Sequence, residues 1–289
     1  PRLITTPARG VFKVLSSALG YGVYDAFYLL HWSWSGLNHE DTAAHVVELF
    51  GPSYNTPARG GAVWETEADV SNMDGSHSVY EFEGFWHALE YLVAPEDLDR
   101  ARTVFELSFF NRVSSAGGAY DQEFALGSGL WLTTIYNTYT GALLAYRARR
   151  KVLGESASAA YKTCGGHSGD DSIMRDFPSA DELVECYSQL GFKITAKTRP
   201  RGSRDVSFLA RIYDTRDGSS VPDALRALSK RHLTSQPKDT PIEQIVLGKW
   251  GPVWIDDRHT GIYGAIAKYI LDRAVPGFTA KGDDDALAD

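Results

Sequence analysis

The sequence predicts an α+β fold in which an antiparallel sheet packs on helices. Short segments with strand-like alternation of polar and apolar residues lie between longer segments with helical periodicity. A hairpin is expected at 160–175, where Gly169 permits a tight turn between two short strands, and hairpin strands are antiparallel. No low-complexity linker divides the chain.

The periodicity also predicts where each element lies. Residues 62–70 alternate as a strand does, with Thr66 and Ala68 on one face and Glu65 and Asp69 on the other. Further strands are expected near 191–197 and 206–213, besides the hairpin. Helices are expected at 8–34, 40–50, 80–92, 95–111, 131–152, 179–190, 222–231, 241–248 and 261–274, with a Gly-containing connection at 114–121.

Composition and charge narrow the class of protein. With 43% hydrophobic residues, the chain of 289 residues is globular rather than disordered. Its net charge of −8 is unlike that of a generic nucleic-acid binder, which carries a basic surface. Part of this acidity lies in segment 282–289. The basic residues gather at 147–151 and 193–204, where we expect solvated surface.

The chain shows no sign of a membrane span or a secretion signal. No stretch approaches the roughly 20 apolar residues that a spanning helix needs. A start at Pro1 rather than Met suggests a piece of a longer parent. Cys164 and Cys186 are too few for a zinc cluster or a disulfide scaffold, so we expect buried free thiols.

A first acidic motif closes the strand predicted at 62–70. Asp69 stands near the end of the strand, and Asp74 follows five residues later in a turn before Gly75. A carboxylate at a strand end is held rigidly and can present oxygen to a hard cation. The alternative is ordinary turn chemistry, because Asp and Gly are both favoured in turns.

A second acidic motif, Ser168-Gly169-Asp170-Asp171, lies within the predicted hairpin. Gly169 permits a tight turn, so the two carboxylates are expected at its tip. Adjacent like charges repel, and the pair is unfavourable unless a cation compensates it. An exposed acidic turn without a metal has the same pattern.

A third motif precedes the long helix predicted at 131–152. Ser128 and Gly129 form a loop that runs into this helix, and Thr133 and Asn137 share one helix face because they are four residues apart. They can offer a hydroxyl and an amide to the same ligand. The alternative is a capping Ser with polar side chains that are satisfied locally.

Together the three motifs predict two-metal phosphoryl transfer. This chemistry needs carboxylates from separate strands that converge on cations about 3.5–4 Å apart. Asp69 and Asp170, expected on neighbouring strands, fit that requirement. Asp74 and Asn137 would then lie where the ribose of an incoming nucleotide sits, able to bind its 2′-hydroxyl.

These motifs resemble those of the palm domain of RNA-dependent RNA polymerases from positive-strand RNA viruses, and their amino-acid sequences are most similar to the nodavirus type. The run from Asp69 to Asp74 resembles motif A, including Ser-Asn-Met-Asp-Gly. The further segments with a counterpart are 128–138 (motif B), 168–171 (motif C), 190–197 (motif D) and 206–211 (motif E, the primer-grip hairpin). The resemblance covers about residues 60–215.

The resemblance implies a right-hand polymerase with partial fingers and a C-terminal helical thumb. Residues 1–60 would be fingers and palm helices, and 61–215 the palm with motifs A to E, carrying a fingers-side insertion at 76–125. Residues 216–289 would be thumb-like helices and an acidic tail. The basic fingers motif that grips the triphosphate has no counterpart here beyond Arg2.

The resemblance also implies a role for each motif residue. Two Mg²⁺ or Mn²⁺ ions would be held by Asp69 and Asp170, with Asp171 as a weaker or second-metal ligand. A motif D lysine would protonate the departing pyrophosphate; its spacing from Gly191 favours Lys197, with Lys193 as the alternative. The residues implied to check the ribose and position the nucleotide are Asp74, Ser128, Gly129, Thr133 and Asn137.

The implied function is template-directed RNA synthesis from NTPs in viral genome replication. The partners would be a single-stranded RNA template, nascent RNA and other copies in a replication complex. The implied location is the host cytoplasm, at membrane-associated complexes reached through segments absent here. Two alternatives remain open. A reverse transcriptase typically places an aromatic steric gate where Asp74 stands. A non-catalytic palm-like RNA-binding module would be expected to lose Asp69, Asp170 or Asn137.

Overall fold

The computed structural model describes residues 10–50, 64–115, 118–127, 130, 132–200, 205–231, 233 and 236–275. These residues form two compact units, one within 1–209 and 214–218 and the other within 210–213 and 219–289. Each unit is described by itself. The larger unit contains all three acidic and polar motifs.

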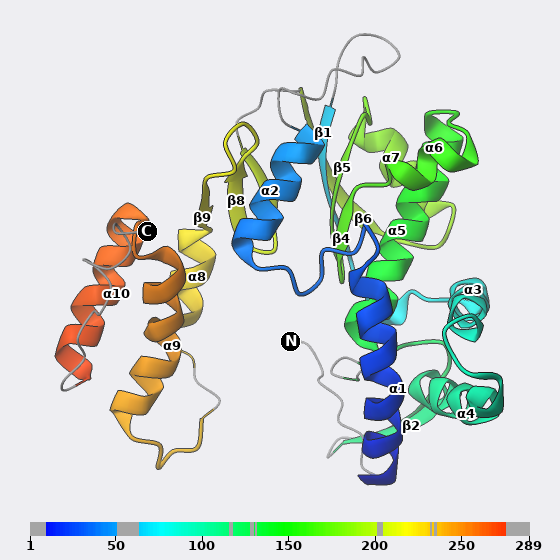
Figure 1. Cartoon of the computed structure of the whole chain (residues 1–289), viewed down its shortest axis with the longest axis horizontal. Coiled ribbons are helices and arrows are strands. Elements are labelled where there is room, and N and C mark those ends of the chain that lie inside the picture. Colours follow the sequence, from blue (N-terminus) through cyan, green and yellow to red (C-terminus); the bar gives the residue numbers. More distant parts are fainter. Residues whose placement is uncertain are drawn as a thin grey trace. The chain divides into compact units, whose positions relative to one another are not determined.

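A four-stranded antiparallel sheet lies at the centre of the larger unit (Figure 1). Its strands, in spatial order, are β4 (Gly166–Ser168), β5 (Asp171–Arg175), β1 (Trp64–Val70) and β6 (Ile194–Pro200). In β1, Thr66, Ala68 and Val70 are buried and Asp69 is exposed, as the alternation predicts. Glu65 is buried as well, contrary to its predicted place on a polar face.

Helices cover both faces of this sheet (Figure 1). On one face lie α5 (Thr133–Val152) and α7 (Ala180–Ser188), with the short α6 (Ala157–Lys162) beside α5. On the other face lies α2 (His39–Phe50). The strand β7 (Asp205–Phe208) lies beside β1, where the Ser207 N–H donates to the Glu67 carboxylate at 2.7 Å.

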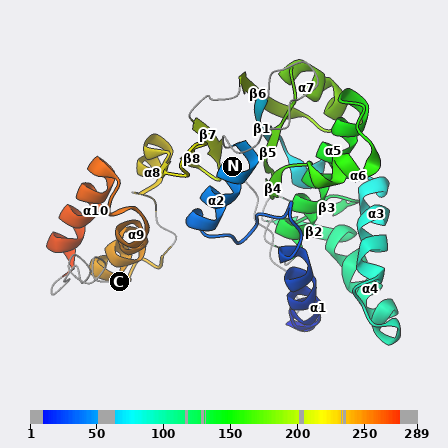
Figure 2. The ribbon, with the colours of Figure 1, turned by 45° about the horizontal axis from the view of Figure 1, so that its top comes forward.

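A helical layer with an aromatic core follows the first acidic motif in the chain. It consists of a 3-10 turn η1 (Met73–Gly75), α3 (Val79–Glu90), a turn η2 (Pro95–Asp97) and α4 (Leu98–Phe109). Figure 2 shows α3 and α4 next to each other. Ser78 and Glu81 form a capping box at the start of α3. The rings that join this layer to α5 are Phe82, Phe85, Phe105, Phe109 and Tyr136.

The first helix, α1 (Gly10–Tyr28), is shorter than the predicted 8–34. Beyond Tyr28 the chain turns and runs parallel to β4: the Trp34 N–H donates to the His167 carbonyl, and the His167 N–H to the Trp32 carbonyl, each at 2.9 Å. Both indoles are buried. Backbone hydrogen bonds with a distant strand therefore end the helix earlier than its periodicity predicts.

Further elements differ from prediction. The expected connection at 114–121 is a hairpin of β2 (Asn111–Ser115) and β3 (Gly118–Gln122). The predicted hairpin at 160–175 is narrower, since α6 occupies its first residues and pairing begins at Gly166. The strand predicted at 206–213 is interrupted at Leu209 and Ala210, which both have positive φ, so that β7 ends at Phe208 and a second strand begins at Arg211. Strand β6 and the helices α2 and α7 lie within a few residues of their predicted places.

The smaller unit is mainly helical. It contains most of β8 (Arg211–Asp214), β9 (Ser220–Pro222), α8 (Ala224–Arg231), α9 (Ile242–Asp257) and α10 (Gly261–Ala274). The sequence predicts an end at 248 for the helix that here runs through Pro252 to Asp257. The reason is packing: Trp250 and Val253 lie against Ala267 and Leu271 of α10, which outweighs the poor helix propensity of Gly and Pro.

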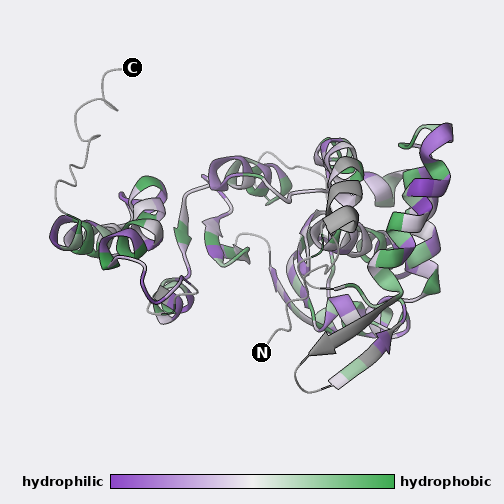
Figure 3. Ribbon diagram, turned by 90° about the horizontal axis from the view of Figure 1, so that it is seen from below, coloured by the Kyte–Doolittle hydropathy of each residue, from purple (hydrophilic) through white to green (hydrophobic). Residues whose placement is uncertain are grey.

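None of the helices in the described ranges is both long and apolar enough to span a bilayer. Figure 3 shows hydrophobic and hydrophilic residues interspersed along the helices.

Arg149 corrects the expectation that the basic cluster at 147–151 is entirely solvated. Its side chain is 1% exposed and joins α5 to the loop that follows it and to the end of β5. It donates to the Glu155 carboxylate at 2.6 and 2.9 Å, to the Arg175 carbonyl at 2.8 Å and to Asp176 at 3.2 Å. A buried cation with this many acceptors is a structural tie between α5 and the end of β5.

We therefore expect Arg149→Met to lower the free energy of unfolding by about 3–5 kcal/mol, because it leaves Glu155 without its cation and Asp176 with only the 3.5 Å ion pair to Arg175. Denaturant unfolding followed by circular dichroism measures this. Arg147→Met on the same helix is the matched control, with an expected change within about 0.5 kcal/mol. Equal losses for the two variants would contradict the assignment.

Candidate active site

The register between β1 and β5 brings the two acidic motifs together. Asp69 lies directly opposite Asp171, and Thr195 lies on the other side of Asp69 in β6. Opposite residues of antiparallel strands have Cα atoms about 4.5–5.5 Å apart, and their side chains lie on the same face. With Ser168 opposite Asp171 in β4, a polar row crosses the four strands.

Asp170 lies in the two-residue turn between β4 and β5, beside this row. The turn has a positive φ of 61° at Gly169, the first of its two residues, as type II′ hairpin turns do. The Val70 N–H donates to the Asp170 carbonyl at 3.2 Å, which ties the turn to the end of β1. The sequence pairs Asp69 with Asp170, whereas in the sheet the direct partner of Asp69 is Asp171 and Asp170 is the next residue.

This donor set suits a hard cation. Three carboxylates, Asp69, Asp170 and Asp171, lie at the adjoining ends of β1 and the hairpin, and oxygen is the ligand that Mg²⁺ and Mn²⁺ prefer. Within the described residues, no three acidic, His or Cys side chains lie close enough together to hold a metal ion, so these carboxylates suit a cation by their chemical type and not by a preformed cage.

A second group of polar side chains surrounds Asp74 in η1. The Asn137 amide on α5 donates to the Asp74 carboxylate at 2.7 Å, so these two residues of different motifs lie together. The amide oxygen of Asn137 in turn lies 2.9 Å from Nε2 of His77. The Asp74 carbonyl accepts from the Leu126 N–H at 2.7 Å, so η1 is held from two sides.

His77 is a member of this group that sequence reasoning missed. It is buried, and burial lowers the pKa of its imidazole to about 4, so the ring is neutral at physiological pH. Its ring lies edge-on to Tyr136 and Phe192. Its position three residues after Asp74 was the only sequence signal, and a His beside a turn has no distinctive pattern.

The turn of the second motif is held by Thr138, the residue after Asn137. The Gly169 N–H donates to the Thr138 hydroxyl at 2.9 Å, and this hydroxyl donates to the Thr134 carbonyl at 2.7 Å. The buried Ser35 hydroxyl lies 2.8 Å from Thr138 and 3.1 Å from Ser168. Ser35 was also missed, because it follows a segment that the sequence assigns to a helix.

The remaining motif B residues are only partly placed. The Thr133 hydroxyl donates to the Gly127 carbonyl at 2.9 Å, across the start of α5. It lies four residues from Asn137, one turn earlier on α5, and its bond to Gly127 is a local one. Ser128 and Gly129 lie outside the described residues.

The two candidate lysines lie on either side of Asp69. Lys197 is opposite Glu67 in β6, and the Lys193 carbonyl accepts from the Ser71 N–H at 2.8 Å. Both are exposed and, by the alternation of β6, on the face of Asp69. Neither forms an ion pair within 4 Å among the described residues, whereas Glu67 is paired with Arg199 at 3.1 Å. The backbone register therefore does not decide which of the two lysines is the better candidate for the general acid.

Buried groups on the opposite face are structural. His167 is fully buried between the Ser172 hydroxyl at 2.8 Å and the Cys164 carbonyl at 3.1 Å, and burial lowers its pKa to about 4. It is a packed residue of β4. Cys164 and Cys186 are buried free thiols, as predicted, and burial raises the pKa of Cys164 to about 12.

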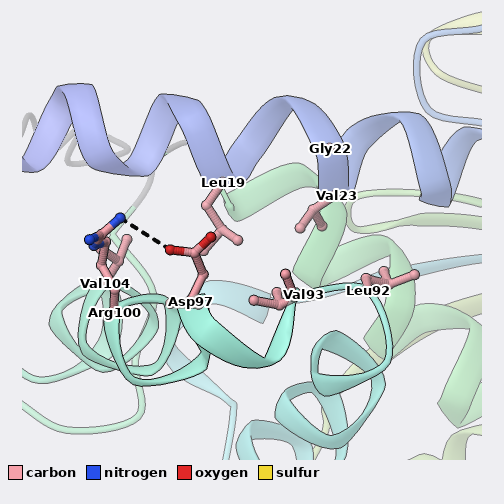
Figure 4. A pocket seen from close by; sticks show the side chains of 10 residues that line it. Leu19, Gly22, Val23, Leu92, Val93, Asp97, Arg100 and Val104 are labelled. Carbon is pink, nitrogen blue, oxygen red and sulfur yellow. Dashed lines mark hydrogen bonds and ion pairs between the residues drawn. The ribbon is translucent and has the colours of Figure 1, made fainter.

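A hollow of about 280 Å³ lies elsewhere, between α1 and the start of α4 (Figure 4). Its walls are mostly apolar, among them Leu19, Val23 and Val104, and Asp97 and Arg100 form an ion pair of 3.1 Å at its edge. None of the predicted site residues lines it, so it is separate from the acidic motifs.

Two curated relatives share sequence with this chain, whereas no protein-family model matches it. The RNA-directed RNA polymerase of Pariacoto virus is 30% identical over 218 residues, which are 71% of this chain and 22% of that protein. The RNA-directed RNA polymerase of Atlantic halibut nervous necrosis virus is 33% identical over 155 residues, 53% of this chain and 16% of that protein. The chain thus matches about a fifth of the length of these relatives.

Solved structures agree on the fold. The RNA-dependent RNA polymerase of a human picorbirnavirus superposes with a TM-score of 0.69 at 17% identity, covering 91% of this chain and 51% of that one. Its insertion-loop deletion mutant gives a TM-score of 0.66 at 17% identity, with 92% and 52% covered. The chain is a relative of the nodavirus RNA-directed RNA polymerases and has the α+β fold of viral RNA polymerases, which confirms the predicted fold class.

The bond from Gly169 to Thr138 leads to a prediction that does not depend on activity. Thr138→Val keeps the shape but removes the acceptor, so we expect a loss of about 1–3 kcal/mol in the free energy of unfolding. The Gly169 amide should also exchange hydrogen faster. Thr138→Ser keeps the hydroxyl and is the control. Unchanged exchange at Gly169 in the Val variant would contradict this role.

Proposed function

We propose that this relative of the nodavirus polymerases forms the catalytic palm of an RNA-dependent RNA polymerase, which copies a single-stranded RNA template from NTPs in viral genome replication. The observation that carries the proposal is the register that places Asp69 opposite Asp171, with Asp170 in the adjoining turn. The names of the sequence relatives support it.

The carboxylates would bind two Mg²⁺ or Mn²⁺ ions. Asp69 and Asp170 are proposed as the principal ligands and Asp171 as a weaker or second-metal ligand, since all three lie where β1 and the hairpin adjoin. When bound, such ions activate the attacking 3′-hydroxyl of the nascent RNA and neutralise charge on the triphosphate. The chain's own contribution is a rigid backbone that fixes where the carboxylates lie.

The polar group around Asp74 would check the sugar. A carboxylate accepts hydrogen bonds only, so Asp74 can accept from a ribose 2′-hydroxyl, which a deoxyribose lacks. Asn137 holds one Asp74 oxygen at 2.7 Å and so fixes the carboxylate in place. Ser128, Gly129 and Thr133 are proposed to position the nucleotide at the start of α5.

A lysine would donate a proton to the departing pyrophosphate. We propose Lys197, with Lys193 as the alternative, because both lie on the face of Asp69 at its two sides. The larger unit would correspond to the palm with a fingers-side insertion at 76–125, and the helices beyond 216 to the thumb. Self-association and a place in membrane-associated replication complexes of the host cytoplasm are part of the same proposal.

Two other functions are less well supported. A reverse transcriptase would gain from an aromatic gate at Asp74, where this chain has a carboxylate held by Asn137. A non-catalytic RNA-binding module has no need of the Asp69–Asp171 pairing, since opposite carboxylates are unfavourable without a cation.

The metal ligands can be tested in the full-length protein with a single-stranded RNA template, NTPs and Mg²⁺ or Mn²⁺. We expect Asp69→Asn and Asp170→Asn each to lower template-dependent synthesis about 100-fold or more, with a smaller loss for Asp171→Asn. Asp97→Asn, at the separate hollow, is the control and should retain activity. Product undiminished in Asp170→Asn would sink the assignment, and dNTPs used as well as NTPs would favour a reverse transcriptase.

The general acid is tested by comparing Lys197→Leu with Lys193→Leu. Loss of a general acid typically costs about 10²–10⁴-fold in rate, and the pH dependence that its protonation imposes on kcat should vanish with it. We expect this in Lys197→Leu and only a modest change in Lys193→Leu. The reverse result would transfer the role to Lys193, and a small effect in both would remove it from these residues.

A further inference from the structure

Three buried or half-buried side chains form a chain of hydrogen bonds with a single direction. The Asp74 carboxylate only accepts, so the group of Asn137 that lies 2.7 Å from it must be the amide NH₂. The amide oxygen of Asn137 must then point to His77, whose Nε2 lies at 2.9 Å. An oxygen cannot donate, so Nε2 of His77 must carry the proton.

The surroundings of His77 favour the tautomer with the proton on Nε2 over the one with the proton on Nδ1. Its Nδ1 is buried and has no hydrogen-bond partner within the described residues. A proton on Nδ1 would leave that buried N–H unsatisfied and Nε2 facing the Asn137 oxygen with no hydrogen between them. Aromatic rings of Tyr136 and Phe192 pack edge-on against the imidazole and hold it in place.

We propose that His77 is a positioning residue for sugar selection: it fixes the orientation of the Asn137 amide, and through it the Asp74 carboxylate that distinguishes NTPs from dNTPs. This inference rests on the proposed polymerase function and adds to it a residue outside the three motifs. His77 touches neither the nucleotide nor the metal ligands in this scheme.

The physical reason lies in the symmetry of an amide. Asp74 favours the orientation that presents the Asn137 NH₂ group to it, and in the turned-over state the amide oxygen would instead repel that carboxylate. Without a donor at His77 the amide oxygen loses its own hydrogen bond, and the Asn137 side chain is held from one side only. His77 makes the turned-over state unfavourable, because its Nε2–H would then face the Asn137 NH₂ group. Asp74 is thereby kept in one position, where it can accept a hydrogen bond from the 2′-hydroxyl of each NTP that binds.

The experiment compares two amide replacements in the full-length protein. His77→Gln reaches about as far as Nε2 and keeps a donor there, whereas His77→Asn reaches only about as far as Nδ1 and loses it. We expect His77→Asn to lower the ratio of kcat/KM for NTPs to kcat/KM for dNTPs about tenfold, mainly through the NTP term, and His77→Gln to restore most of it. His87→Asn, on exposed α3 surface, should leave the ratio unchanged.

Other measurements separate the outcomes. Imidazole ¹⁵N NMR of the wild-type protein, which needs no variant to fold, should show the Nε2–H tautomer for His77, and an Nδ1–H tautomer would overturn the proposal. So would an unchanged NTP-to-dNTP ratio in a folded His77→Asn protein. Equal loss of activity toward both nucleotides in the Asn and Gln variants would indicate a purely structural role and overturn it too. If the wild type makes no RNA at all, the proposed polymerase function fails. The tautomer measurement needs no activity, so a failure of the His77 proposal is distinguished from a failure of the polymerase function.

Discussion

Two consecutive residues of one helix hold both acidic turns on which the candidate site depends. Asn137 of α5 donates to Asp74 in the turn after β1, and Thr138 accepts from the Gly169 N–H in the turn of the β4–β5 hairpin. Residues adjacent on a helix point about 100° apart, so a single turn of α5 can reach two loops in different directions. The spacing of the two turns is therefore set by helix geometry rather than by the loops themselves.

The helix can serve this purpose because it is tightly packed against the sheet. A side chain on Gly141, one turn beyond Asn137, would bring its Cβ to 3.3 Å from His167 Nδ1 and 3.4 Å from Ser172 Oγ, tighter than ordinary contact. On the opposite face, a Cβ on Gly166 would lie 2.3 Å from the Trp34 ring. The hairpin is thus confined between α5 and an indole, and its neutral, buried His167 adds no charge to that interior.

The features predicted from the sequence are those with a local cause. Alternation along β1, the length of α5 and the Gly169 turn each follow from neighbours in the chain, and the structure contains all three. The end of α1 at Tyr28 follows instead from backbone bonds between residues 32–34 and His167, more than 130 positions away. No local pattern carries that information.

The same distinction separates the motif residues from their supports. Asp69, Asp74, Asp170 and Asn137 stand in recognisable motifs, whereas His77 and Ser35 act only through partners far along the chain. Arg149 stands in a basic run typical of solvated surface, yet it is 1% exposed because Glu155 and Asp176 surround it. Sequence periodicity places backbone segments, but it does not identify the pairings between side chains that orient them.

This division has a consequence for the energetics of the site. Carboxylates directly opposite each other in a sheet are destabilising, so the strands that bear Asp69 and Asp171 must be held together by interactions elsewhere. Three sets of residues supply these interactions: Thr138 at the turn, the Arg149 cluster at the far end of β5, and Thr66, Ala68 and Val70 on the buried face of β1. All of them lie outside the acidic row. The fold can therefore place carboxylates opposite each other across β1 and β5, because these further interactions hold the two strands together.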